Sequence, residues 1–97
     1  MQHAYFSASS ERFCNEHPST ILGYLAQHHA FDLNQLQRNA WVEQISILQK
    51  QIQIVGPSWI ALEYAIPRMG KRADAVILAS GIVFVIEFKS TTTYSAA

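Results

Sequence analysis

The sequence predicts an α/β protein in which two helices precede a three-stranded β-meander. Apolar residues recur at helical spacing in the first half of the chain, a Gly-Pro pair at 56–57 ends that pattern, and short apolar runs separated by turn residues follow it. The chain has 97 residues, of which 49% are hydrophobic, so it has room for one small core. We expect one unit over residues 19–97, preceded by an irregular segment or short irregular helix over residues 1–18, where no periodicity is visible.

The two helices are expected at about residues 20–30 and 33–53. Ser19 and Asp32 are the expected cap residues, because each comes just before an apolar pattern at helical spacing. One apolar stripe of the second helix should pack against the sheet, with Trp41 beside it as a core residue. The stripe consists of Leu33, Leu36, Ala40, Ile45, Leu48 and Ile52.

Three strands are expected at residues 59–66, 72–78 and 82–88, joined by turns at PRMGK and ASG. Strand side chains alternate with a period of two, so Asp74 and Glu87 should each face the same way as the residues at alternate positions of the same strand. Those residues are Arg72, Val76 and Leu78 on the second strand, and Val83, Val85 and Lys89 on the third.

Charge is balanced over the chain, with seven basic and seven acidic residues. This balance excludes a general attraction to polyanions or membrane surfaces, so any nucleic-acid contact has to come from local clustering. The loop over residues 67–72 provides such a cluster, and Arg68, Lys71 and Arg72 are candidates for contacts with nucleic-acid phosphates. The alternative is a solvated hairpin tip.

Cysteine content and hydropathy indicate the compartment. Cys14 is the single cysteine of the sequence, so no internal disulfide and no Cys/His zinc site can form. No apolar run is long enough to span a bilayer, and the N-terminus does not have the pattern of a signal peptide. We therefore expect a cytoplasmic protein that does not contact a membrane.

Asp74, Glu87 and Lys89 are the residues that carry chemistry. The turn at ASG lies midway between Asp74 and Glu87, so antiparallel pairing should bring the two carboxylates together. Two carboxylates in an apolar sheet are costly unless a cation such as Mg²⁺ or Mn²⁺ neutralises them. Lys89 could then polarise an attacking water and stabilise charge on a phosphoryl oxygen, which is suited to phosphodiester hydrolysis. The alternative is a surface Glu-Lys pair worth less than about 1 kcal/mol.

The motif formed by Asp74 and, after the hairpin, Glu87-Phe88-Lys89 resembles the D…ExK signature of PD-(D/E)xK, or restriction-endonuclease-like, nucleases. More narrowly, the run LEYAIPRMGKRADAVILASGIVFVIEFK resembles a bacterial family of unknown function that joins such a domain to a superfamily 1 helicase, over about residues 20–96. The resemblance implies a restriction-endonuclease-like core, cleavage of DNA and a helicase partner. It also implies Asp74 and Glu87 as metal ligands and Lys89 as the catalytic lysine.

Glu43 and Glu63 are further candidate metal ligands. Many members of the superfamily supply an acid from the first core helix, a role that Glu43 would take; the alternative is an exposed helix glutamate. Glu63 is expected on the strand face of Trp59 and Ala61, where an unpaired charge is unfavourable, so it should form an ion pair or join the metal site. Its candidate ion-pair partners are Arg72 and Lys71.

The sequence departs from the signature in two ways. Ala73 stands where the signature has proline, which shapes a turn and binds no metal. A second core helix and fourth strand, which follow the ExK strand in related proteins, are also missing, so the domain is expected to be partial and its activity in isolation stays open. The alternative function is an inactive accessory module of a helicase that binds nucleic acid or protein. The sequence leaves the oligomeric state open, and a homo-oligomer is one of the alternatives.

Overall fold

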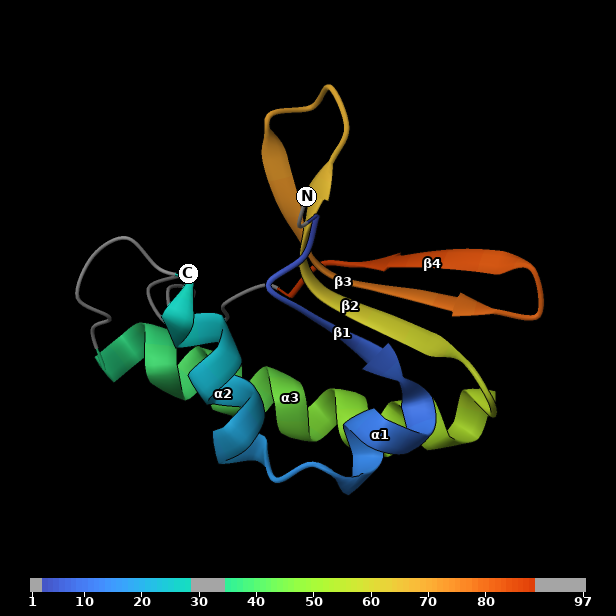
Figure 1. Cartoon of the computed structure of the whole chain (residues 1–97), viewed down its shortest axis with the longest axis horizontal. Helices are drawn as coiled ribbons and strands as arrows, with labels where there is room; N and C mark the ends of the chain where they lie inside the picture. Colours follow the sequence, from blue (N-terminus) through green and yellow to red (C-terminus); the bar gives the residue numbers. More distant parts are fainter. Residues whose placement is uncertain (1–2, 29–34, 89–97) are drawn as a thin grey trace, which may run out of the picture.

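A computed structural model describes residues 3–28 and 35–88. Within these ranges it contains three helices and one four-stranded antiparallel sheet, which is compatible with the α/β class. The strands lie side by side in chain order: β1 (Phe6–Ser9), β2 (Trp59–Ile66), β3 (Lys71–Ala79) and β4 (Ile82–Ile86). The helices α1 (Ser10–Asn15), α2 (Pro18–Gln27) and α3 (Gln35–Val55) come between β1 and β2 in the chain and cover one side of the sheet (Figure 1).

The two predicted helices are present as α2 and α3, with shifted ends. α2 begins at Pro18 because His17 caps it: the ring Nδ1 accepts a hydrogen bond from the Ser19 backbone N–H at 3.1 Å, and proline suits the first helical position. α3 ends as expected before Gly56, whose φ of 89° is a conformation that glycine adopts without steric cost. Asp32 lies outside the described residues. No helix in the described part of the chain has both the length and the apolar character needed to cross a membrane.

The N-terminal segment differs from the expectation of an irregular entry. Residues Phe6–Ser9 form β1, which pairs antiparallel with β2, so the prediction of three strands is wrong by one strand. The short helix α1 follows, capped by Ser9, whose hydroxyl accepts a hydrogen bond from the Arg12 backbone N–H at 3.2 Å. A four-residue strand with two serines has little intrinsic β-preference; pairing with β2 and the burial of Phe6 and Ala8 stabilise it.

One hydrophobic core lies between the helices and the sheet. The predicted stripe of α3 is confirmed from Trp41 onward, because Trp41, Ile45, Leu48 and Ile52 are all buried. Leu36 is 81% exposed and does not belong to the stripe, and Leu33 lies outside the described residues. The largest fully buried side chains are Phe13, Ile21, Leu25, Ile45, Ile52 and Ile60.

Gln49 connects α3 to the end of α1 by hydrogen bonds. Its side-chain amide donates hydrogen bonds to the backbone carbonyls of Phe13 and Glu16, at 2.9 and 2.8 Å. The thiol of Cys14 donates in turn to the Gln49 backbone carbonyl at 3.6 Å. Carbonyls at the end of a helix have no partner within it, so these contacts satisfy groups that a short helix would leave unpaired.

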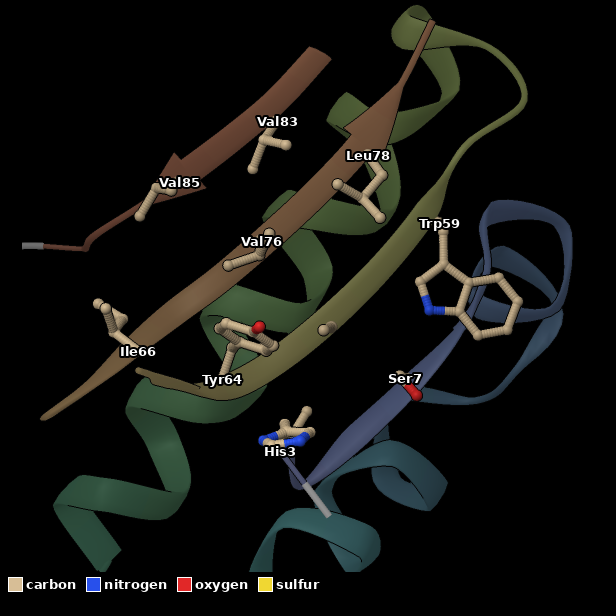
Figure 2. Close-up of a pocket in the computed structure, with 11 residues that line it drawn as sticks. His3, Ser7, Trp59, Tyr64, Ile66, Val76, Leu78, Val83 and Val85 are labelled. Carbon is tan, nitrogen blue, oxygen red and sulfur yellow. The ribbon is translucent and has the colours of Figure 1, made fainter. Parts of the chain in front are cut away.

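On β2 the alternation of side chains shifts at Glu63. Trp59 and Ala61 line the open side of the sheet, away from the helices, and so do Tyr64 and Ile66 (Figure 2). A regular strand cannot place both pairs on one side. The shift occurs because Glu63 has a left-handed backbone, with φ of 53°. The expectation that Glu63 shares a face with Trp59 and Ala61 is therefore wrong, and its side chain faces the helices.

On β1 and β3, the strands on either side of β2, the alternation of side chains shifts at the same level of the sheet. On β1, Phe6 belongs to the core, and the preceding Tyr5 also packs against the core from the helix side. On β3, Ala75 belongs to the core and the preceding Asp74 lines a depression beside the helices, whereas Val76 lines the open side. Asp74 thus does not share a face with Val76 as predicted. We call the row of Tyr5, Glu63 and Asp74 the bend of the sheet; beyond it, the β2–β3 hairpin turns away from the helices (Figure 1).

Replacing Ile52 by alanine should lower the free energy of unfolding by about 2–5 kcal/mol, because its side chain is 1% exposed and the change leaves a cavity. Ile54 lies on the same helix and is 79% exposed, so Ile54→Ala should change stability by less than about 0.5 kcal/mol. Urea denaturation followed by circular dichroism measures both. Equal losses in the two variants would contradict the described packing of α3.

Candidate functional site

One cross-strand row of the sheet carries three acidic residues. The last paired row before the bend consists, from β1 to β4, of Phe6, Leu62, Ala75 and Ile86. Continued by one position toward the β2–β3 turn, the same register would place Tyr5, Glu63, Asp74 and Glu87 at one level, where Glu63 and Asp74 do not form a ladder pair and Glu87 is exposed beyond the end of β4. We call Glu63, Asp74 and Glu87 the acidic row. The two consecutive turns of the β2–β3–β4 meander thereby bring these three carboxylates toward one level of the sheet.

The juxtaposition of Asp74 and Glu87 follows from the turn between β3 and β4. Ser80 and Gly81 form this turn with φ values of 52° and 77°, the mirror-image conformation that matches the twist of two antiparallel strands. Phe88 lies just past the end of β4, and its backbone N–H donates a hydrogen bond to the carboxylate Oδ2 of Asp74 at 2.6 Å. The Asp74 side chain therefore holds the chain on the C-terminal side of Glu87, while the ladder pair of Ala75 and Ile86 holds it on the N-terminal side.

Glu63 and Asp74 line a small depression between the sheet and the helices. The other lining residues are Leu25, Trp41, Gln44, Ile45, Leu48 and Leu62. The Trp41 indole N–H donates a hydrogen bond to the Glu63 carboxylate. Trp41 is almost fully buried, and a buried indole N–H needs an acceptor. The bond satisfies the indole and fixes the Glu63 side chain on the helix side.

Electrostatics at the acidic row favour the protonated form of Glu63. Burial and then the negative charge of Asp74 raise the pKa of Glu63 above its ordinary value of 4.5, and the charge of Glu87 adds to the rise. The hydrogen bond from Trp41 and the positive charge of Arg72 act in the opposite direction. The net rise is the behaviour of a half-buried carboxylate that lies close to others of the same charge.

The donor set suits a hard divalent cation. Carboxylate oxygens are the protein ligands that Mg²⁺ and Mn²⁺ prefer, and a cation would oppose the effects of burial and of the Asp74 charge that raise the pKa of Glu63. Within residues 3–28 and 35–88, no three His, Cys, Asp or Glu side chains are arranged to hold a metal ion together. Mg²⁺ commonly keeps several waters and binds one or two carboxylates, so the fit rests on the chemistry of the row and not on a preformed cage.

The other predicted site residues are not all brought to this row. Glu43 is exposed on α3 and does not line the depression. Lys89 lies outside the described residues, so its place beside Glu87 stays a prediction. Arg68 and Lys71 are exposed at the β2–β3 turn, where Arg68 has a left-handed backbone with φ of 66°.

Arg72 makes contacts on the helix side of the sheet. Its Nη1 donates a hydrogen bond to the backbone carbonyl of Glu63 at 2.5 Å and a longer one to the carbonyl of His3 at 3.5 Å. The guanidinium carbon lies 4.4 Å from the centre of the Tyr5 ring. The predicted pairing of Glu63 with Arg72 thus takes a different form, because the hydrogen bond is made to the Glu63 backbone.

Two side chains at the site have roles that the sequence does not predict. Trp41 is predicted as a core residue and is buried, but its bond to Glu63 is an additional role. The available signal is the indole N–H itself, which needs an acceptor wherever a tryptophan is buried. Tyr5 stands in a segment without periodicity, and no sequence signal indicates that it stacks under Arg72.

Comparisons of the chain with protein-family models, curated proteins and solved structures gave no significant match.

Glu63→Gln should stabilise the metal-free protein at neutral pH and leave it unchanged in acid. The folded state binds the Glu63 proton more tightly than the unfolded chain, so wild-type stability falls as pH rises from 4.5 through the raised folded-state pKa. Glutamine cannot ionise and keeps an oxygen that accepts from Trp41. Urea unfolding over a pH series measures the difference, with Glu11→Gln on α1 as the control. A gain that is constant over the whole pH range would contradict the described electrostatics.

Proposed function

We propose that this chain carries the metal-binding part of a nuclease that hydrolyses phosphodiester bonds in DNA with Mg²⁺ or Mn²⁺, on a core of the restriction-endonuclease type. The acidic row is the observation that carries the proposal. The register of the neighbouring pairs, continued by one position, supports the proximity of its residues, and burial together with the negative charges of Asp74 and Glu87 raises the pKa of Glu63, which provides a reason for a cation to bind. Phosphodiester hydrolysis is the chemistry to which a carboxylate-bound divalent ion beside a lysine is suited.

In this proposal Asp74 and Glu87 bind the metal ion, and Glu63 joins them only when the ion binds, since the described residues do not arrange three such side chains as a preformed site. A bound ion supplies Lewis acidity, which stabilises the charge that grows on the phosphate and favours ionisation of the attacking water. The hydrogen bond from the Phe88 N–H orients the Asp74 carboxylate, and the bond from Trp41 orients that of Glu63. Lys89 is proposed to hold the attacking water, as the resemblance to the ExK motif implies.

The β2–β3 hairpin is proposed to contact the DNA backbone. Arg68 and Lys71 are exposed at its turn, and the hairpin projects away from the helices (Figure 1). Cations at such a position attract phosphates without reading base sequence. We further propose that the module works beside a helicase domain, since a helicase exposes single strands to a neighbouring nuclease.

A second candidate function is an inactive accessory module that binds a protein. The observation that favours it is the open side of the sheet, where a groove of about 580 Å³ has a mainly apolar lining (Figure 2). Trp59, Leu78, Val83 and Val85 line this groove, and each is between 47% and 59% exposed. Contiguous apolar surface of this kind commonly marks an interaction site.

Asp74→Asn should abolish binding of Mg²⁺ and Mn²⁺, because it removes the ligand charge at the centre of the acidic row while preserving its shape. Isothermal titration calorimetry of the wild type and the variant measures the loss. Glu11→Gln is the control, since it removes one carboxylate from an exposed position on α1. Cleavage of labelled single- and double-stranded DNA, assayed in parallel, should require the metal and Asp74. Equal metal binding by wild type and Asp74→Asn would reject the nuclease site and leave the accessory module.

Replacing Arg68 and Lys71 together by glutamine should weaken DNA binding and reduce its dependence on salt. Each cation that contacts a phosphate releases about one counterion, so the double variant should lower the slope of log K against log salt by about two. Fluorescence anisotropy of labelled DNA at several salt concentrations measures this slope. The double variant Arg38→Gln, Lys50→Gln, with both residues exposed on α3, should leave it unchanged. The same slope in both double variants would exclude the hairpin as the contact.

A further inference from the structure

The hydrogen-bonded ladder between β2 and β3 is interrupted at the bend. Within these two strands, Leu62 pairs with Ala75 and Tyr64 pairs with Ala73, but Glu63 and Asp74 between them do not form a ladder pair. The left-handed φ of Glu63 turns its peptide group out of the plane of the ladder. A main-chain carbonyl that leaves its ladder takes another donor, which at this exposed position is either water or a side chain.

Arg72 supplies that donor from the neighbouring strand. Its Nη1 donates to the Glu63 carbonyl at 2.5 Å, and the Tyr5 ring lies below the guanidinium at 4.4 Å. The C-terminal end of α2 holds the Tyr5 ring in place, because Tyr5 stacks on His28 with ring centres 5.0 Å apart and planes inclined by 13°. The guanidinium is therefore held in a defined place by a directed bond and a stacked ring.

We propose that Arg72 is a positioning residue, whose guanidinium holds the turned carbonyl of Glu63 and so keeps the Glu63 carboxylate beside Asp74. Without this donor, an extended backbone at Glu63 would return the carbonyl to the ladder. Regular alternation would then carry the Glu63 side chain to the open side of the sheet, with Ala61. Arg72 thus selects which side of the sheet Glu63 faces.

This role differs from a purely electrostatic effect of a nearby cation. A positive charge at position 72 would attract carboxylates whether or not it formed a directed bond, and a lysine would provide it equally well. The planar guanidinium is needed to donate to the carbonyl and to stack on Tyr5 at the same time. The proposal therefore distinguishes arginine from lysine at this position.

The first test is structural and uses the metal-free protein. NMR spectra report the backbone conformation of Glu63 through its Cα and Cβ shifts, and its contact with Trp41 through a nuclear Overhauser effect to the indole N–H. Arg72→Gln and Arg72→Lys should both lose the left-handed shifts and the contact. Arg38→Gln, the same substitution at an exposed position of α3, should keep both.

Two outcomes would overturn the proposal. One is a folded Arg72→Gln protein in which Glu63 keeps its conformation and its contact with Trp41. The other is loss of the contact in Arg72→Gln together with full retention in Arg72→Lys, because charge alone would then suffice. If circular dichroism shows that Arg72→Gln is unfolded, Arg72→Lys decides: loss of the contact in that variant supports the positioning role, and full retention overturns it.

The consequence for metal affinity rests on the proposed function, whereas the orientation of Glu63 does not. Removing a residue that orients a metal ligand typically weakens metal binding on the order of 10-fold. Titration with Mg²⁺ should therefore show a loss of affinity of this size in Arg72→Lys and no loss in Arg38→Gln. If the wild-type chain binds no metal, the proposed function fails and the NMR comparison still decides the role of Arg72. Wild-type affinity in a variant that has lost the Glu63 contact would exclude Glu63 as a ligand.

Discussion

The left-handed peptide at Glu63 determines which side chains the two halves of the sheet present to the helices. A strand that stayed extended through this residue would place Glu63 among the apolar side chains of the open side and Tyr64 against the core. The turned peptide exchanges the two: the carboxylate lies under α3, and the aromatic ring lies on the open side. The side of the sheet on which Glu63 and Tyr64 lie follows from this one backbone angle.

The bend is also where the chain accepts several unfavourable contributions at once. A left-handed backbone costs a residue with a side chain about 1–2 kcal/mol, and the half-buried carboxylate of Glu63 lies close to that of Asp74. The indole of Trp41 and the guanidinium of Arg72 offset part of this cost, each with a hydrogen bond to a different part of Glu63. Strained backbone and crowded charge at the same residue are typical of sites that are kept for function.

The turns explain why one part of the site could be predicted from the sequence and another could not. A two-residue turn fixes the register of the strands it joins, so the position of Ser80 and Gly81 is enough to pair Ala75 with Ile86 and to bring Asp74 to the Phe88 N–H, next to Glu87. Periodicity also located α2, α3 and three strands. The side that Glu63 faces was not predictable, because alternation presumes an extended backbone. Residues 6–9 become a strand through pairing with β2, a contact that no local pattern records.

Glu63 and Asp74 lie on one face of a single layer of backbone, and the apolar groove lies on the other. Glu63 faces the helices, whereas Trp59, Tyr64 and Ile66 face the groove, so the two surfaces share none of these side chains. A molecule in the groove and an ion at the row would therefore bind with additive free energies as long as the sheet keeps its shape. If one ligand changed the dissociation constant of the other, the effect would have to be transmitted through the angle of the bend. The size of that change would measure how stiff the sheet is at the bend.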